Sequence, residues 1–193
     1  MTAHSISDVR SVVYCLGGHP ADAFGPAPQR YLPVAFNEAT VHAVTQAYRT
    51  RASRVQSSAT LATEAHQIAV QNVHRALVSI LEAVVREGGL GAVPDLDARL
   101  RGLMPSGGRF VADVAEDAAV LVNVRGLAAR LVAAHDPGGD LTDRLLASPS
   151  VFVRLGVAIG LADAEAWDVL SRMRTDLSPA VAAEVRFLLA DTE

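Results

Sequence analysis

Lysine is absent from this 193-residue chain, and all 17 of its basic residues are arginine. The abundance of Ala, Gly, Val and Arg indicates a GC-rich, bacterial-type composition, which explains the missing lysine more simply than selection against lysine conjugation does. The 21 acidic residues leave a formal net charge of −4. A protein that binds nucleic acid without sequence preference usually has a basic excess. The composition therefore disfavours that class of function.

Cysteine and long hydrophobic runs are also scarce. The single cysteine, Cys15, excludes a disulfide framework within the chain. Asp8 and Arg10 stand where a signal peptide needs an apolar stretch. The longest apolar runs, such as Leu155–Ala162, are far shorter than the roughly 20 residues that span a bilayer. We therefore expect a cytoplasmic protein without a membrane segment.

Aromatic residues make up only 5% of the chain, whereas apolar residues make up 50%. A core built from Ala, Val and Leu suits closely packed helices. Helical spacing of apolar residues recurs along the chain and strand patterns do not, so the expected fold class is all-α. We expect one domain over residues 1–193, in which an N-terminal helical hairpin or bundle, 1–89, packs on C-terminal helical hairpins, 90–193.

The N-terminal half contains a long loop and a long helical segment. Residues 17–33 hold three glycines and four prolines, which predicts a loop. The next segment has neither residue type until Gly88-Gly89, which is expected to end it. Residues 38–87 form either one helix or two helices that turn near Ser57-Ser58. The two-helix alternative is favoured, because a single helix would be about 75 Å long.

The C-terminal half is divided by proline, glycine and capping residues. Pro105 is expected to end one helix, and the apolar residues on most sides of the next predict a central buried helix. The pairs Ser148-Pro149 and Ser178-Pro179 place proline at the first helical position, and Asp163 is a third start signal. The predicted helices are Asp95–Met104, Arg109–Ala134, Leu141–Ala147, 149–162, 164–175 and 179–190.

A short pattern recurs three times in this half, beginning at Val124-Arg125, Val153-Arg154 and Val185-Arg186. The copies are 29 and 32 residues apart (153 − 124 and 185 − 153). Periods of this length are typical of helical solenoids. Gly126 and Gly156 follow the pattern and are expected to interrupt their helices.

The run from Ser148 to Asp191 resembles HEAT-like helical repeats. It has a Ser-Pro start, a Val-Arg pair followed by small and aliphatic residues, an acidic turn at Asp163 and Glu165, and a second helix. The resemblance implies a stacked α-hairpin scaffold with a concave protein-binding face.

Polar residues on the middle helices suggest a metal site. Glu38 and His42 are four residues apart and share a helix face. If the chain turns back near residue 57, His42 comes level with His74, and His66 lies on the same helix as His74. Facing helices build metal sites from carboxylates and imidazoles in this way. Ordinary exposed ion pairs are the commoner role for such residues.

Two further groups of residues are candidates for a catalytic thiolate and for an anion-binding site. Cys15 and His19, with Asp22 nearby, have the residue types of an activated thiolate, although a small buried hydrophobe is the commoner role of a helix cysteine. A second group, formed by Arg49, Arg51 and Arg54, suits phosphate, carboxylate or nucleic-acid partners, although such a run is usually a solvated face.

Phe152 and Trp167 lie at regular apolar spacing and are expected in the core. P-loop, dinucleotide-binding, zinc-protease and nucleophile-elbow motifs are absent from the sequence. The leading hypothesis is therefore a non-catalytic protein–protein interaction scaffold or adaptor that binds another protein or itself and needs no cofactor. The alternatives are a helical metal-binding protein or enzyme that uses Glu38, His42, His66 and His74, and a regulatory protein that contacts nucleic acid or phosphate through Arg49, Arg51 and Arg54.

Overall fold

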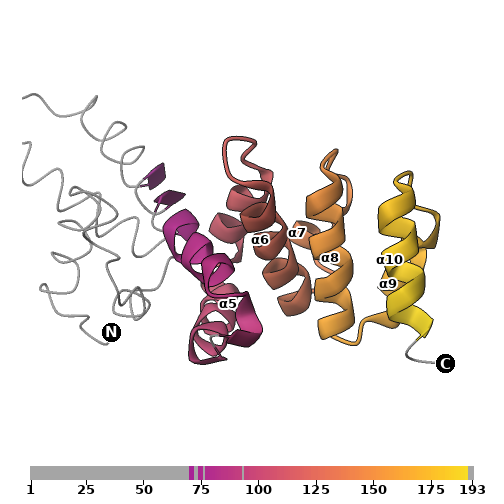
Figure 1. Ribbon diagram of the computed structural model, residues 1–193, viewed down its shortest axis with the longest axis horizontal. Helices are drawn as coiled ribbons and strands as arrows, with labels where there is room; N and C mark the ends of the chain where they lie inside the picture. Colours follow the sequence, from indigo (N-terminus) through magenta and orange to yellow (C-terminus); the bar gives the residue numbers. More distant parts are fainter. Residues whose placement is uncertain (1–69, 72–73, 76, 93, 191–193) are drawn as a thin grey trace, which may run out of the picture.

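The computed structural model describes residues 70–71, 74–75, 77–92 and 94–190, and within these residues it is all-α, as predicted (Figure 1). Residues 77–86 are helical, as are 70–71 and 74–75. The elements that follow are η2 (Leu90–Ala92), α5 (Pro94–Glu116), α6 (Val122–His135), α7 (Asp140–Leu146), α8 (Val151–Asp163), α9 (Trp167–Ser171), η3 (Arg172–Thr175) and α10 (Pro179–Ala190). No described helix is both long and apolar enough to span a membrane.

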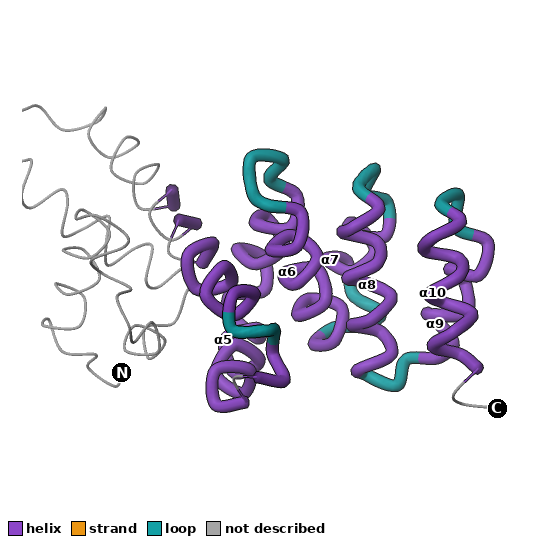
Figure 2. The backbone as a smooth tube through the Cα atoms, in the orientation of Figure 1, coloured by secondary structure: helices purple, strands orange, loops and turns teal. Residues whose placement is uncertain are grey.

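The helices from α6 to α10 form a stack in two rows. Helices α6, α8 and α10 lie side by side in one row, with α8 in contact with both of its neighbours (Figure 1). Helix α7 returns the chain between α6 and α8, and α9 with η3 returns it between α8 and α10. The three helices of the first row therefore run in the same direction. The loops that lead into them lie at one end of the stack (Figure 2).

One apolar core runs through all of these helices. Valines at the third residue of α6, α8 and α10 are fully buried, namely Val124, Val153 and Val181. The three helices begin at residues 122, 151 and 179, which are 29 and 28 residues apart. The structural repeat is therefore more regular than the sequence pattern indicated. The third copy of that pattern, Val185-Arg186, is one helical turn too late, because buried valines four residues apart look alike in sequence.

The glycines of α6 and α8 do not interrupt their helices, contrary to the prediction. They lie inside the helices, where the two backbones approach closely. A Cβ atom on Gly156 would lie closer than 3.0 Å to the carbonyl oxygen of Gly126, and one on Gly160 would meet the carbonyl oxygen of Arg130 in the same way. Real Cβ atoms essentially never reach such separations. Gly156 and Gly160 are therefore required by the packing of α8 on α6.

The helix that precedes η2 follows the prediction closely. Its apolar stripe is buried, and Leu77, Ile80, Leu81 and Val84 are all fully inaccessible. It ends at Gly88 and Gly89, which have φ angles of 102° and 99°. The N–H of Gly89 donates to the carbonyl of Val84 over 2.9 Å, as in a glycine C-cap. The choice between one and two helices over 38–87 concerns residues outside the described part of the chain.

Helix α5 differs from the prediction at Pro105 and at its C-terminal end. It continues through Pro105 to Glu116, so the predicted end at Met104 is wrong. The predicted single helix Arg109–Ala134 is also wrong, because its residues are divided between α5 and α6. Burial of Met104, Phe110 and Val111 on either side of Pro105 offsets the cost of the missing N–H bond. The break comes instead after Glu116. There Asp117 accepts the N–H of Ala119 over 2.8 Å and stabilises a turn.

The helix starts predicted at Pro149 and at Asp163 are also wrong. Helix α8 begins at Val151 with Ser150 as N-cap, so Pro149 lies outside the helix. Asp163 is the last residue of α8 rather than the start of the next helix, and it accepts two hydrogen bonds from Arg130. In contrast, α10 begins at Pro179 and ends at Ala190, as predicted.

Candidate functional site

Of the residues predicted to hold a metal or a phosphate group, the structure describes only His74. Glu38, His42 and His66 lie outside the described residues, and so do Arg49, Arg51 and Arg54. The same holds for Cys15, His19 and Asp22. The metal-binding and phosphate-binding alternatives therefore stay predictions.

His74 is paired with a carboxylate of the turn between α5 and α6. Its Nε2 lies 2.9 Å from Oδ2 of Asp117, and both side chains are partly exposed. The N–H of Ala119, and then His74 and Arg125, hold the pKa of Asp117 below its ordinary value of 3.8, against the opposing effect of burial. The carboxylate is thus ionised at neutral pH and accepts a hydrogen bond from the Nε2–H of His74. Among the described residues, no group of three or more His, Cys, Asp and Glu side chains could hold a metal ion.

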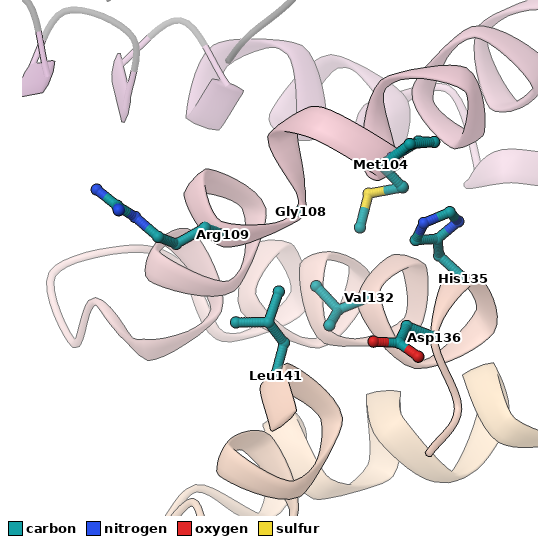
Figure 3. Close-up of a pocket in the computed structure, with 8 residues that line it drawn as sticks. Met104, Gly108, Arg109, Val132, His135, Asp136 and Leu141 are labelled. Atoms are coloured by element: carbon teal, nitrogen blue, oxygen red, sulfur yellow. The ribbon is translucent and has the colours of Figure 1, made fainter. Parts of the chain in front are cut away.

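A hollow of about 290 Å³ lies between α5, the end of α6 and α7 (Figure 3). Five of the eight residues that line it are apolar or glycine, and the other three are ionisable, namely Arg109, His135 and Asp136. Arg109 points away from the hollow in Figure 3, and its guanidinium carbon lies 5.5 Å from the Phe110 ring centroid. The ionisable groups do not converge on one point, as a reacting or charged ligand would require.

Large apolar side chains are exposed at the end of the stack where α6, α8 and α10 begin. Leu121 is the N-cap of α6 and Val122 its first residue, Phe152 is the second residue of α8, and Leu177 precedes α10. Their exposed fractions are 61%, 46%, 51% and 98%. The loops that lead into the three helices all lie at this end (Figure 2). We call these four residues the N-terminal edge.

Two of the three arginines of the sequence repeat brace the backbone beneath the N-terminal edge. Arg125 donates from Nε to the carbonyl of Ala115 over 2.9 Å, and so ties α6 to α5. Arg154 donates from Nη1 to the carbonyl of Ser148 over 2.7 Å. Both arginines follow a fully buried valine at the start of their helix. The Val-Arg pairs of α6 and α8 therefore have a structural role, which is to hold the edge in place.

Arg154 also joins the loop before α10 to α8. Its Nε and Nη2 donate to the two carboxylate oxygens of Asp176 over 2.8 and 3.0 Å. Oδ1 of Asp176 accepts the N–H of Ser178 over 2.7 Å as well. The hydrogen bonds from Arg154, aided by that of Ser178 and opposed by burial, hold the pKa of Asp176 below its ordinary value of 3.8. This network fixes the position of the loop that carries Leu177.

Sequence reasoning missed the N-terminal edge. It placed Phe152 in the core, which is wrong, because the buried face of α8 is the one that carries Val153, Val157 and Leu161. Phe152 is one residue from Val153 and so lies about 100° away around the helix. Trp167, predicted with it, does pack against the core.

The N-terminal edge is therefore the surface of the described residues with the most exposed large apolar side chains. Comparison of the chain with protein-family models, with curated proteins and with solved structures finds no match.

Proposed function

We propose that the protein is a non-catalytic interaction scaffold that binds a protein partner through the N-terminal edge. The observation that carries this proposal is the exposure of four large apolar side chains, Leu121, Val122, Phe152 and Leu177, at one end of the helix stack. Single exposed apolar residues are ordinary, but a group at one edge favours an interaction surface. Stacked helical hairpins serve this purpose well, because the backbone that carries such a group barely moves on binding.

The identity of residue 121 adds support. Leu121 occupies the N-cap position of α6, with φ −56° and ψ 139°, and no side chain caps the helix. Leucine is one of the least favourable residues at an N-cap, and serine is one of the best. Leu121 is also 61% exposed, so the core gains little from its side chain. A binding role accounts for a residue that local stability disfavours.

The variant Leu121→Ser is therefore expected to be more stable than the wild type, by about 0.5 to 1 kcal/mol, because the serine hydroxyl can cap α6. Urea unfolding followed by far-UV circular dichroism measures this change. Phe152→Ser is the matched control, since residue 152 lies inside α8 and its change should stay within about 0.5 kcal/mol. A loss of stability in Leu121→Ser would show that Leu121 belongs to the core and not to a binding surface.

Site-specific photo-crosslinking tests the proposed function. Benzoylphenylalanine at position 152 preserves an aromatic side chain at the N-terminal edge. The control carries it at Gly138, which is exposed in the turn between α6 and α7, with no atom within 4 Å of a Cβ there. We expect irradiation of the protein in its own host to give a discrete adduct with another protein from position 152 and none from position 138. An identical set of adducts at both positions, or none at either, would contradict the proposal.

A further inference from the structure

The outer face of α10 carries an apolar stripe that no described part of the chain covers. Phe187 is 64% exposed, and Ala180, Ala183 and Ala190 are exposed as well. Their spacing of three or four residues places them on one side of the helix. The opposite side packs on the core through Val181, Ala182, Val185 and Leu189. We call the four exposed residues the α10 stripe.

The α10 stripe occupies the same place on α10 as the surface of α6 that receives α8. On α6 that surface is formed by the fifth, ninth and twelfth residues, Gly126, Arg130 and Ala133, which lie against Gly156 and Gly160. The fifth, ninth and twelfth residues of α10 are Ala183, Phe187 and Ala190. Because α6 and α8 run in the same direction, the stripe is equivalent in position to a surface that receives a parallel helix.

Charged residues flank the stripe with opposite signs. At about 100° per residue, Glu184 lies on one flank of the stripe and Arg186 on the other. Neither side chain takes part in an ion pair with another described residue. A partner helix that fits the stripe should therefore present a basic group beside Glu184 and an acidic group beside Arg186.

We propose that the α10 stripe binds a second copy of the chain through a parallel pair of α10 helices. A twofold axis parallel to the two helices brings the Glu184 flank of each copy against the Arg186 flank of the other. The two residues differ by two positions, or about 3 Å along the helix, so both ion pairs are within reach of their side chains. An antiparallel pair would instead place Glu184 beside the partner's Glu184. The pairing is thus self-complementary, as an interface between identical chains requires.

Phe187 supplies most of the apolar area of this contact. In the parallel pair the two phenylalanines lie at the same level, and the alanines beside them allow the helices to approach. Helix α10 has only 12 residues. Its face is smaller than the roughly 800 Å² per partner of a standard interface, so the dissociation constant is expected to be on the order of micromolar. This self-association uses a different surface from the N-terminal edge and does not depend on the proposed partner.

Sedimentation velocity of the full chain over a range of concentrations tests this proposal. We expect a monomer–dimer equilibrium that Phe187→Ala weakens by about tenfold or more. Glu184→Arg and Arg186→Glu should each weaken it by about threefold to tenfold, because each places like charges together. The double variant restores opposite charges and should return to within about twofold of the wild type. Phe152→Ser is the control and should leave the dimer unchanged.

Three results would overturn the proposal. The first is a wild-type chain that stays monomeric at concentrations of about 0.1 mM, well above the expected constant. The second is a dimer that Phe187→Ala does not weaken. The third is a dimer that depends on Phe187 but ignores the single charge reversals or is not restored by the double one, since this excludes the parallel pairing. Crosslinking from position 152 is read separately, so either proposal can fail while the other stands.

Discussion

The variant Gly156→Ala is expected to lose about 2 to 3 kcal/mol of unfolding free energy. In an ordinary helix the same change is stabilising, because alanine loses less conformational entropy than glycine. Here the new methyl group would meet the carbonyl oxygen of Gly126 at less than 3.0 Å. A backbone oxygen inside a helix cannot turn away as a side chain does, so α6 and α8 must separate. The separation exposes or loosens the core between them.

Gly102→Ala is the matched control for this prediction. Gly102 lies in α5, is exposed and has no atom within 4 Å of a Cβ at its position. The change should raise the unfolding free energy by about 0.5 to 1 kcal/mol. Urea unfolding at equilibrium gives both values. If Gly156→Ala were neutral or stabilising, like the control, α6 and α8 would not approach as closely as the structure shows.

The variant Asp176→Asn is expected to lose about 2 to 3 kcal/mol at neutral pH. The side chains of Arg154 and Asp176 are only 13% and 10% exposed, so the guanidinium is left largely desolvated without a counter-charge. Asparagine still offers an oxygen to the N–H of Ser178, which limits the change to the ion pair. The expected loss is below that for fully buried pairs, because some solvent reaches both groups.

The pH dependence of this effect has a definite sign. The folded-state pKa of Asp176 lies below 3.8, so its ionised form stabilises the fold at pH values above 3.8. That stabilisation is lost as the pH falls through the folded-state pKa. The difference between the wild type and Asp176→Asn should therefore be largest near neutral pH and should shrink below pH 3.8. A difference that stays constant or grows on acidification would contradict this assignment.

Asp113→Asn provides the exposed counterpart. Asp113 pairs with Arg144 over 3.1 Å, and the two side chains are 44% and 40% exposed. Solvent screens such pairs, so this variant should change the unfolding free energy by less than about 0.5 kcal/mol at any pH between 3 and 7. A loss of unfolding free energy as large as that of Asp176→Asn would show that solvent exposure does not explain the difference between the two ion pairs.

The all-α class and several helix ends were predictable from the sequence, because their signals are local. Gly88 and Gly89 adopt positive φ, which other residues rarely do, and so end the helix that precedes η2. Pro179 suits the first residue of a helix for a similar local reason. The buried residues Leu77, Ile80, Leu81 and Val84 have the three- and four-residue spacing of one helix face, which is also a local signal.

The misplaced boundaries have causes outside the local sequence. Helix α5 passes through Pro105 because buried side chains on both sides of it stabilise a continuous helix. It ends at a hydrogen bond between Asp117 and the N–H of Ala119, and a lone aspartate in an apolar run is a weak signal. The prediction that Gly126 and Gly156 break their helices is wrong because a close contact between two helices is not encoded in either helix alone.

The candidate site was less predictable than the fold. Sequence reasoning selected charged and metal-ligating side chains, whereas the N-terminal edge consists of apolar residues that look like core residues until the packing is known. Leu121 and Phe152 become distinctive only when the buried faces of α6 and α8 are defined by their neighbours. The repeated arginines were noticed, but their role as braces for the edge depends on which carbonyl groups they reach.

Native mass spectrometry of the protein purified from its own host tests the interaction scaffold most directly. The wild type is compared with the double variant Leu121→Ser/Phe152→Ser, after circular dichroism has shown that both are folded. We predict that the wild type retains another protein that the double variant has lost, while any dimer of the chain itself is unchanged. A wild type that retains no other protein, or retains it equally in the double variant, would contradict the account.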